Sequence, residues 1–581
     1  MSGRNMRAPR AERERGSADR RMMPAALAVW ATLLARHAVG EHWDVAVMTA
    51  MGVSLAAGVA VLLLTRGGPD ARPRKAAPRI GPQCLWHAAV LLAAVGCATV
   101  AGGLSDLAES RDPLIGLLGS GESGVVTVTA VATTPVMSSE RREADCQIDM
   151  RVRTVWSRDV GSPSNATVRA FAEDDACRWR QGAAYRVSGT LKAARFGSAT
   201  AWLDVDRDDD VRETSPPPGW RAMGTRMQEA FFAQTDRLGD QGRVLVPGLT
   251  IGVLGQDVHR QETEGASPVD DTYAGALEED FKRSGIMHPM AVSGSHFVLA
   301  AELVRRCCAR LLAPRWFAAV GVIGAYAVLV ALVYPSDSVL RAAAMGMVGV
   351  AGLFLGRRSQ ALSSLNWTVI AILLIRPELS GSYGFALSCA AVYGIVLFDA
   401  AVAGFLEGLM PTTLARAVSV TVCAQIPTLP IQVMMNPQVP LLAVPANVVT
   451  SPVVGMTTLV GLAALLVSWA LPGLGHGLVL LASVGTAVLE RCATLLGSMP
   501  SGTLVWPDGV AGAIAMTAAE LACAAAVAAT MHAMRILRRD DAADAGIPDG
   551  AATGTPYRPT PMSRWTTWWR ETCAMLFDVQ H

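Results

Sequence analysis

The stretch from Phe281 to Phe297 holds the polar side chains with the clearest chemical potential. It places His288 and His296 on either side of the pair Ser293 and Gly294, and long apolar segments follow it. Hydrocarbon offers a polar side chain no water to bind, so polar residues at such a position indicate a functional site. A break in a helix at that depth is tolerated only against protein or a water-filled cavity. The stretch therefore predicts a polar path or a reaction centre inside a membrane.

The same residues allow two other interpretations, a hydrolase and a metal site. Ser293 with His288 or His296 could form a hydrolase, but V-S-G-S-H is not the G-x-S-x-G elbow and no acid partner is visible. The two histidines could share a metal ion, but an intervening proline and no carboxylate make a poor ligand pattern. No G-x-x-x-x-G-K-[ST] motif for a nucleotide occurs. We expect no enzyme, metal or cofactor, and packing between helices remains an alternative role for a histidine.

Composition sets the class of protein that must position these groups. The chain has 581 residues, of which 51% are hydrophobic and 17% charged, and its mean hydropathy is +0.33. These values predict a polytopic α-helical membrane protein. A net charge of +1 lacks the basicity that is usual in nucleic-acid binders, so any contact with DNA must be local.

Apolar runs that approach the roughly 20 residues of a membrane span occur before and after the stretch at 281–297. They cover 24–39, 45–65, 85–103, 289–304, 316–333, 338–355, 363–375, 383–398, 414–435, 441–471, 478–496 and 511–534. Arginines cluster before the first run and between the second and third, which places both on the cytoplasmic side of the membrane. The same rule places the C-terminus in the cytoplasm. Prolines between Pro430 and Pro452 can split helices, so we expect an error of one or two spans.

Between 105 and 217 the pattern changes to short alternating strands. They are predicted at 125–133, 146–156, 166–172, 183–195 and 201–206. Five strands in so short a segment fit an OB-like barrel, inserted outside the membrane. Cys146 and Cys177 lie in this domain. An oxidising compartment would permit a disulfide between them, and two separate buried thiols are the alternative.

This external domain carries a possible contact with DNA. The positive charges are Arg151, Arg153, Lys192 and Arg195, and the aromatic rings that could stack on unpaired bases are Trp156, Trp179, Tyr185 and Trp202. Acidic residues at 173–175 and 204–210 oppose such a contact. Aromatic residues of strands usually pack, so core aromatics with solvated charges are the favoured interpretation.

Several motifs now occur in one order along the chain. Ser284, Gly285, His288, Ala291, Val292, Ser293, Gly294 and His296 resemble the phrase T-G-x-x-H-L-L-A-V-S-G-L-H-V of the ComEC-type competence proteins, the inner-membrane channels of bacterial DNA uptake. Later elements resemble P-S-x-x-R-A (Pro335 to Ala342), G-F-Q-L-S-x-x-A-V-x-G (Gly384 to Gly394) and Q-x-x-T-L-P…P…N…P (Gln425 to Pro452). The resemblance also implies an OB-like domain in this position. The expected domains are a basic tail at 1–23, N-terminal helices at 24–104, the barrel at 105–217, an amphipathic linker at 218–285, the channel at 286–537 and a cytoplasmic tail at 538–581.

The resemblance implies a channel for single-stranded DNA in natural transformation. The residues expected along its path are His288, Ser293, Gly294, His296, Arg341, Ser388, Gln425 and Asn447. A membrane DNA receptor, a cytoplasmic translocase or helicase and membrane lipid are the expected partners. No H-x-H-x-D-H motif occurs, so the metallo-β-lactamase-like domain of many relatives is expected to be missing and a separate nuclease to act.

Alternatives remain for both the cargo and the residues. A transporter of a small or lipid-like substrate is the alternative function, since a shared scaffold does not fix the cargo. Arg341 could pair with Asp337 or with a lipid headgroup, and Asn447 could bridge a broken helix.

Overall fold

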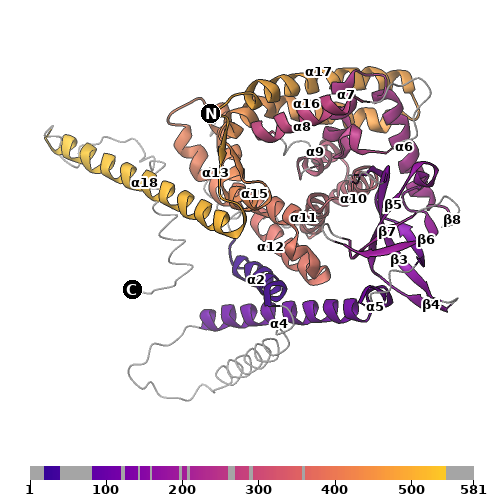
Figure 1. The fold of residues 1–581 in the computed structure, drawn as a ribbon. Helices are drawn as coiled ribbons and strands as arrows, with labels where there is room; N and C mark the ends of the chain where they lie inside the picture. The colour runs from indigo at the N-terminus through magenta and orange to yellow at the C-terminus, as the bar shows by residue number, and fades with distance from the viewer. Residues whose placement is uncertain are drawn as a thin grey trace, which may run out of the picture.

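The computed structural model describes an N-terminal helix pair, a β-barrel and a large helical domain (Figure 1). The described residues are 19–39, 82–119, 125–139, 141, 144–157, 160–194, 199–205, 210–259, 269–286, 292, 294–355 and 360–544. The predicted span at 45–65 and most of both tails lie outside them. Helices α2 (Met23–Val39) and α4 (Pro82–Ser110) lie against each other, and the short α5 (Pro113–Gly119) leads to the barrel.

The barrel contains the five predicted strands. They are β1 (Val125–Ala132), β3 (Cys146–Ser157), β5 (Thr167–Ala172), β6 (Ala184–Ala193) and β7 (Ala201–Asp204). Their order is β1-β3-β5-β7-β6, and pairing of β6 with β1 closes the ring. Strands β5 and β7 are parallel, whereas the other neighbours in the ring are antiparallel. A closed five-stranded ring confirms the OB-like prediction. The short strands β2 (Met137–Ser138), β4 (Val160–Pro163) and β8 (Val211–Ser215) pair at its margins.

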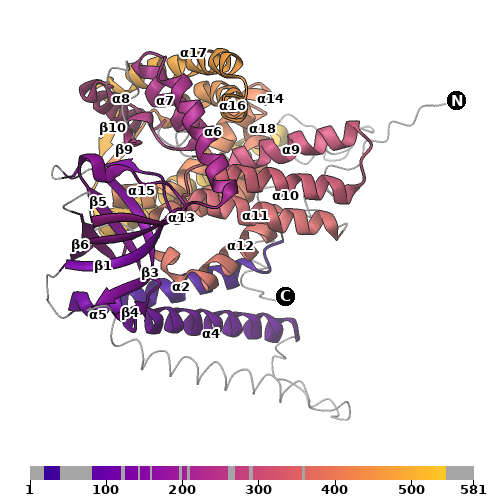
Figure 2. The same ribbon diagram turned by 90° about the vertical axis from the view of Figure 1, so that its right-hand side faces the viewer.

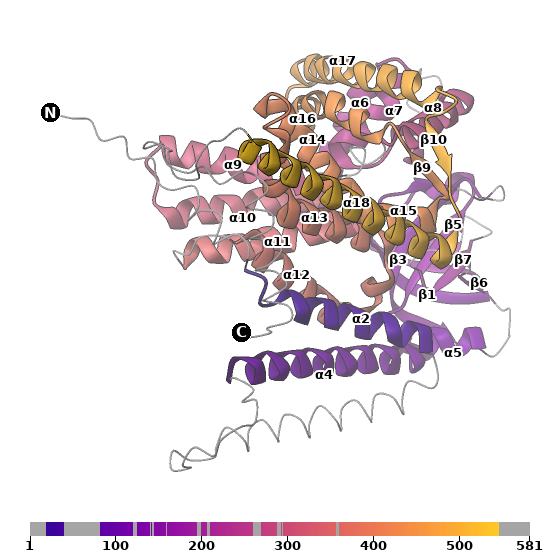
Figure 3. The same ribbon diagram turned by 90° about the vertical axis from the view of Figure 1, so that its left-hand side faces the viewer.

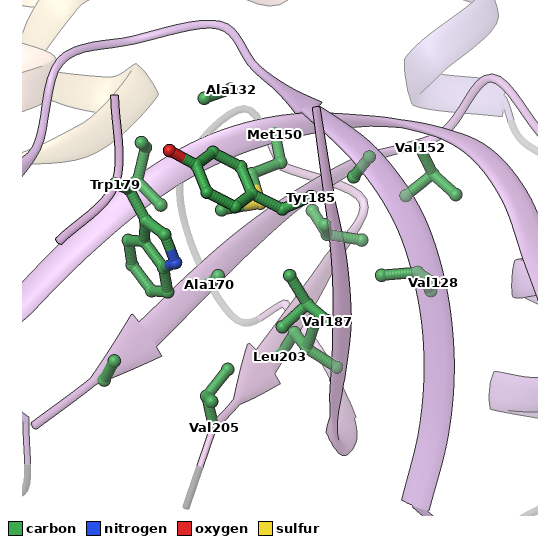
Figure 4. Packing of buried hydrophobic residues seen from close by; sticks show 14 of the residues in the cluster. Val128, Ala132, Met150, Val152, Ala170, Trp179, Tyr185, Val187, Leu203 and Val205 are labelled. Atoms are coloured by element: carbon green, nitrogen blue, oxygen red, sulfur yellow. The ribbon is translucent and has the colours of Figure 1, made fainter. Parts of the chain in front are cut away.

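Alternation of small and large apolar residues builds the barrel core. In β1, every second residue from Val126 to Ala132 is buried. Val128, Met150, Val187 and Leu203 from four strands meet inside the ring (Figure 4). Trp179 and Tyr185 belong to the same core, as the favoured interpretation of the aromatic residues predicts. Closure of the ring also leaves no free edge on its five strands.

A disulfide closes one end of the barrel. Cys146 begins β3, and Cys177 ends the 3-10 helix η2 (Asp174–Cys177), with the two Cα atoms 6.0 Å apart. The linked residues are 31 positions apart. Restricting a loop of that length in the unfolded chain contributes about 3 to 4 kcal/mol to stability.

A linker of short helices leads from the barrel into the helical domain. It comprises α6 (Gly219–Thr235), α7 (Asp240–Ile251), η4 (Gly255–Asp257) and α8 (Asp271–Ser284), which pack on the later helices α16 (Ala443–Val467) and α17 (Pro472–Gly497). Four helices then lie side by side (Figure 2), namely α9 (Gly294–Arg310), α10 (Arg315–Leu332), α11 (Asp337–Phe354) and α12 (Ala361–Ile375). The linker is thus part of the helical core and not a free connector.

The remaining helices complete this domain. They are η6 (Pro377–Gly381), α13 (Tyr383–Leu406), α14 (Thr412–Gln425), η7 (Ile426–Thr428), α15 (Leu429–Met435) and α18 (Gly509–Asp544). Helix α18 runs diagonally across the outside, over α13 and α15 (Figure 3), and it packs on α15. A small sheet of β9 (Gln438–Pro440) and β10 (Thr503–Val505) follows the break caused by Pro437.

Within the described residues, seven helices are long and apolar enough to cross a membrane. They are His87–Ser110, Arg315–Leu332, Tyr383–Leu406, Thr412–Met435, Ala443–Val467, Pro472–Gly497 and Gly509–Thr530. The prediction of a polytopic helical membrane protein with an OB-like domain is confirmed. Helix α9 differs from the predicted span at 289–304, because it begins at Gly294 and bears Glu302, Arg305 and Arg306 in ion pairs on its exposed side.

Candidate functional site

A buried arginine lies at the centre of the helical domain. Arg341 of α11 is only 4% exposed, and its Nε donates a hydrogen bond of 2.6 Å to Oγ of Ser388 on α13. Its Nη1 lies 3.8 Å from Sδ of Met345. No carboxylate forms an ion pair with Arg341 among the residues that the structure describes. A buried cation without an anion is costly, so this position suits an anion that arrives during function.

Gly294 faces the same guanidinium from the first turn of α9. A Cβ added at Gly294 would lie 3.5 Å from Nη2 of Arg341. The structure therefore brings together three predicted path residues from three helices. This convergence brings the motif at 284–296 together with the two later motifs that contain Arg341 and Ser388.

His296 has a different environment, although it lies on the same helix. Its buried ring places Nε2 3.1 Å from the carbonyl oxygen of Leu249 on α7. The next residue, Phe297, packs edge to face on Tyr326 at 5.2 Å. His296 thus links α9 to α7, in keeping with the alternative of helix packing. His288 and Ser293 lie outside the described residues, and within those residues no group of three His, Cys, Asp or Glu side chains could hold a metal ion.

Asn447 holds the chain at Gly285, near the start of the motif at 284–296. Its Nδ2 donates to the carbonyl oxygens of Gly285 at 3.0 Å and Ala443 at 2.8 Å. Gly285 ends α8 with φ of 74°, and a Cβ there would lie 2.5 Å from Cβ of Ala443. Only glycine combines that backbone angle with so close an approach. Asn447 therefore bridges the end of α8 to the start of α16.

Gln425 lies at the contact between α13 and α14. Its main-chain carbonyl oxygen accepts a hydrogen bond of 2.8 Å from Oγ1 of Thr428. On the facing helix, a Cβ added at Gly394 would lie 1.9 Å from the carbonyl oxygen of Cys423. The Gln425 motif and the Gly394 motif thus meet through close helix packing, away from the cluster around Arg341.

Two residues at this site were not predicted as a pair. Asp337 lies one turn before Arg341 on α11, but its carboxylate accepts a hydrogen bond from the hydroxyl of Ser382. Ser382 also caps α13 by accepting from the backbone N–H of Phe385 at 3.2 Å. The alternative in which Asp337 neutralises Arg341 is therefore wrong. A serine directly before an apolar helix is a recognisable cap signal, and it could have identified Ser382.

Three of the four predicted basic residues on the barrel lie within the described part of the chain. Lys192 is bound to Asp204 at 2.6 Å, and Arg195 lies outside the described residues. Burial alone would raise the pKa of Asp204, but hydrogen bonds from Lys192 and Arg141 hold that pKa below its usual value. Arg151 and Arg153 are exposed on β3.

The predicted stacking residues of the barrel are occupied by other contacts. Trp179, Tyr185 and Trp202 are buried. Trp156 donates its indole N–H to Thr129 at 2.9 Å, and the Arg186 guanidinium covers its ring at 4.6 Å. These contacts stabilise the barrel, and three of the four rings are buried in it.

Comparison with known proteins identifies the helical domain. Residues 271–531 match the model of the family described as "Competence protein". A relative, ComE operon protein 3 of Bacillus subtilis (strain 168), is 27% identical over 172 residues, which are 30% of this chain and 22% of that protein. No solved structure matches the chain significantly. The matched segment contains Gly294, Arg341 and Ser388, and the helical domain of this chain is similar to the ComEC-type competence proteins.

Proposed function

We propose that the chain forms a membrane channel that carries single-stranded DNA into the cytoplasm during natural transformation. The observation that carries this proposal is the buried Arg341, which contacts Ser388 and faces Gly294 inside a competence-protein domain. The family and the named relative support a role in DNA uptake.

The electrostatics of this cluster suit a phosphate that passes through. Each nucleotide carries a negative charge, so a strand must move through a wet path lined by protein. A guanidinium can donate two parallel hydrogen bonds to a phosphate. Arg341 uses its Nε on Ser388 and its Nη1 on Sδ of Met345, so the N–H groups of Nη2 would contact the transported strand. A single arginine binds a phosphate weakly enough to release it, and conduction requires such release.

We also place the barrel outside the bacterial plasma membrane and both termini in the cytoplasm. The disulfide between Cys146 and Cys177 supports this orientation, because such bonds persist in oxidising compartments. A membrane DNA receptor would then deliver DNA from outside, and a cytoplasmic translocase or helicase would pull the strand. A separate nuclease would degrade the complementary strand.

Uptake of labelled DNA into a nuclease-protected pool tests the proposal. The strains carry the intact gene, a deletion, Arg341→Gln, Arg341→Lys or Arg305→Gln. Arg305 is the matched control, because it is exposed on α9 and pairs with Glu302 at 3.1 Å. Arg341→Gln removes a charged hydrogen-bond donor, so it should lower the amount of protected DNA about tenfold. Arg341→Lys should retain part of the uptake, and Arg305→Gln all of it.

Membrane abundance of each variant and DNA bound at the cell surface are measured in parallel. Loss of uptake at normal abundance and normal surface binding supports the path at Arg341. Normal uptake by Arg341→Gln, with none in the deletion strain, would refute that path. If the deletion leaves uptake unchanged in a competent strain, DNA is not the cargo and the small-substrate transporter replaces this proposal.

A further inference from the structure

A cavity of about 910 Å³ lies between the barrel, α4 and the turn that joins α12 to η6. Its barrel side is polar and includes Arg151 on β3. Its other side is mainly apolar, with Val100 and Leu104 of α4 and Ile375 at the end of α12. The cavity is separate from the Arg341 cluster, and none of its lining residues belongs to that cluster.

The polar end of this cavity carries positive charge. Within the described part of the chain, the exposed Arg151 guanidinium has no hydrogen-bond or ion-pair partner. Arg376 also lines the cavity, and its Nε contacts Glu378 at 2.8 Å. A guanidinium has five N–H donors, so Arg376 can bind a second anion while it keeps Glu378. Among the lining residues, two arginines against one carboxylate leave a net positive charge in the cavity.

The apolar end follows a helix that can span the membrane. Helix α4 contains the candidate span His87–Ser110, of which only 17% is buried inside the protein. At the end of α12, Ile375 is 79% exposed. A Cβ added at Gly96 on α4 would meet no atom within 4 Å. The groove is therefore open to an apolar occupant.

Hydrogen bonds from both sides fix the frame of the cavity. The Asp112 carboxylate, just after α4, accepts from Oγ of Ser164 at 2.8 Å and from the backbone N–H of Asn165 at 3.0 Å. On the opposite wall, Nε1 of Trp30 on α2 donates to the carbonyl oxygen of Ser380 in η6 at 3.0 Å. The barrel and η6 are thus both tied to the N-terminal helix pair, and the cavity exists before a ligand binds.

We propose that this cavity binds one anionic phospholipid of the leaflet on the barrel side. The phosphate contacts Arg151 and Arg376, and one acyl chain lies along α4 past Gly96. Basic pockets beside membrane helices bind anionic headgroups, and the cavity volume is in the range of ligand sites. A nucleic acid would leave the apolar wall uncovered, whereas a phospholipid satisfies both ends.

Lipid binding to the purified full chain in non-ionic detergent tests this assignment. Native mass spectrometry compares phosphatidylglycerol with phosphatidylcholine of the same acyl chains. Phosphatidylglycerol should bind preferentially, and Arg151→Gln should weaken its binding about tenfold, as expected for one charged hydrogen bond. Arg153→Gln is the matched control, because Arg153 is exposed on the same strand but does not line the cavity. Gly96→Phe should fill the groove and reduce binding of both lipids.

Three results would overturn the proposal. They are equal binding of the two lipids by the intact chain, equal losses in Arg151→Gln and Arg153→Gln, and unchanged lipid binding in Gly96→Phe. A single-stranded oligonucleotide is titrated in parallel. If Arg151→Gln weakens binding of the oligonucleotide and leaves that of phosphatidylglycerol unchanged, the cavity is a nucleic-acid site instead.

Discussion

At the scale of residues, Arg341 and Asn447 show that two polar groups of the helical domain can have different roles. Arg341 donates to a side chain and keeps N–H groups for another partner. Asn447 directs its amide nitrogen at two main-chain carbonyl oxygens. The first arrangement can accept an anion, and the second holds the backbone in place.

Substitution of Asn447 separates these roles. Asn447→Leu and Asn447→Asp both remove the donors to Gly285 and Ala443, so each should lower the free energy of unfolding by about 1 to 3 kcal/mol. Thermal unfolding in detergent measures this change. Thr450→Val is the control, because its hydroxyl bonds only within α16, to Ala446 at 2.9 Å. Both Asn447 variants should also lose DNA uptake equally; a much larger loss in the aspartate variant at equal abundance would place Asn447 on the DNA path.

Resemblance of motifs identified the residues of the site better than their roles. Gly294, Arg341 and Ser388 converge as predicted path residues. His296 and Asn447 have the same polar character in sequence, but their side chains contact main-chain carbonyl oxygens on segments distant in the chain. Gln425 takes part through its main-chain carbonyl oxygen, which accepts from the hydroxyl of Thr428. Residue type does not specify such partners, because they depend on how α7, α8 and α16 pack.

At the scale of elements, close helix contacts depend on particular glycines of α13. At Gly394, a Cβ would lie 1.9 Å from the carbonyl oxygen of Cys423, whereas at Gly404 it would meet nothing within 4 Å. Gly394→Ala should force α13 away from α14 and lower stability by about 1 to 3 kcal/mol. Gly404→Ala should raise it by up to about 1 kcal/mol, the usual gain in a helix. Thermal unfolding compares the two; equal effects would mean that the α13–α14 contact adjusts freely.

The elements that sequence patterns predicted are those with a buried periodic face. The five barrel strands were predicted within a few residues, because inward residues alternate along each. Strand β8 was missed since four of its five residues are exposed, and β4 contains glycine and proline. The start of α9 was misplaced because the apolar run continues back to Pro289, while the helix itself begins at Gly294.

At the scale of the whole molecule, the barrel is attached both to the N-terminal helix pair and to the helical domain. Asp112 holds the turn before β5 to the end of α4. On another side, Oγ of Ser138 donates to the carbonyl oxygen of Gln256 at 3.0 Å, and Met137 bridges to Val258. These contacts place the outer surface of β3 beside the helical domain, where Arg151 lines the proposed lipid cavity.

The proposed orientation of the molecule, which the disulfide supports, can be measured directly. If Cys146 and Cys177 are oxidised because the barrel lies outside, a cysteine at Val160, which is 67% exposed on the barrel, should react with a membrane-impermeant maleimide in intact spheroplasts. Leu311→Cys, at a position 76% exposed beyond α9, should react only after permeabilisation, because nearby arginines keep that loop in the cytoplasm. The exposed native cysteines Cys97, Cys307 and Cys523 are first replaced by serine. Labelling of Val160→Cys only after permeabilisation would place the barrel in the cytoplasm and reverse the direction of transport proposed here.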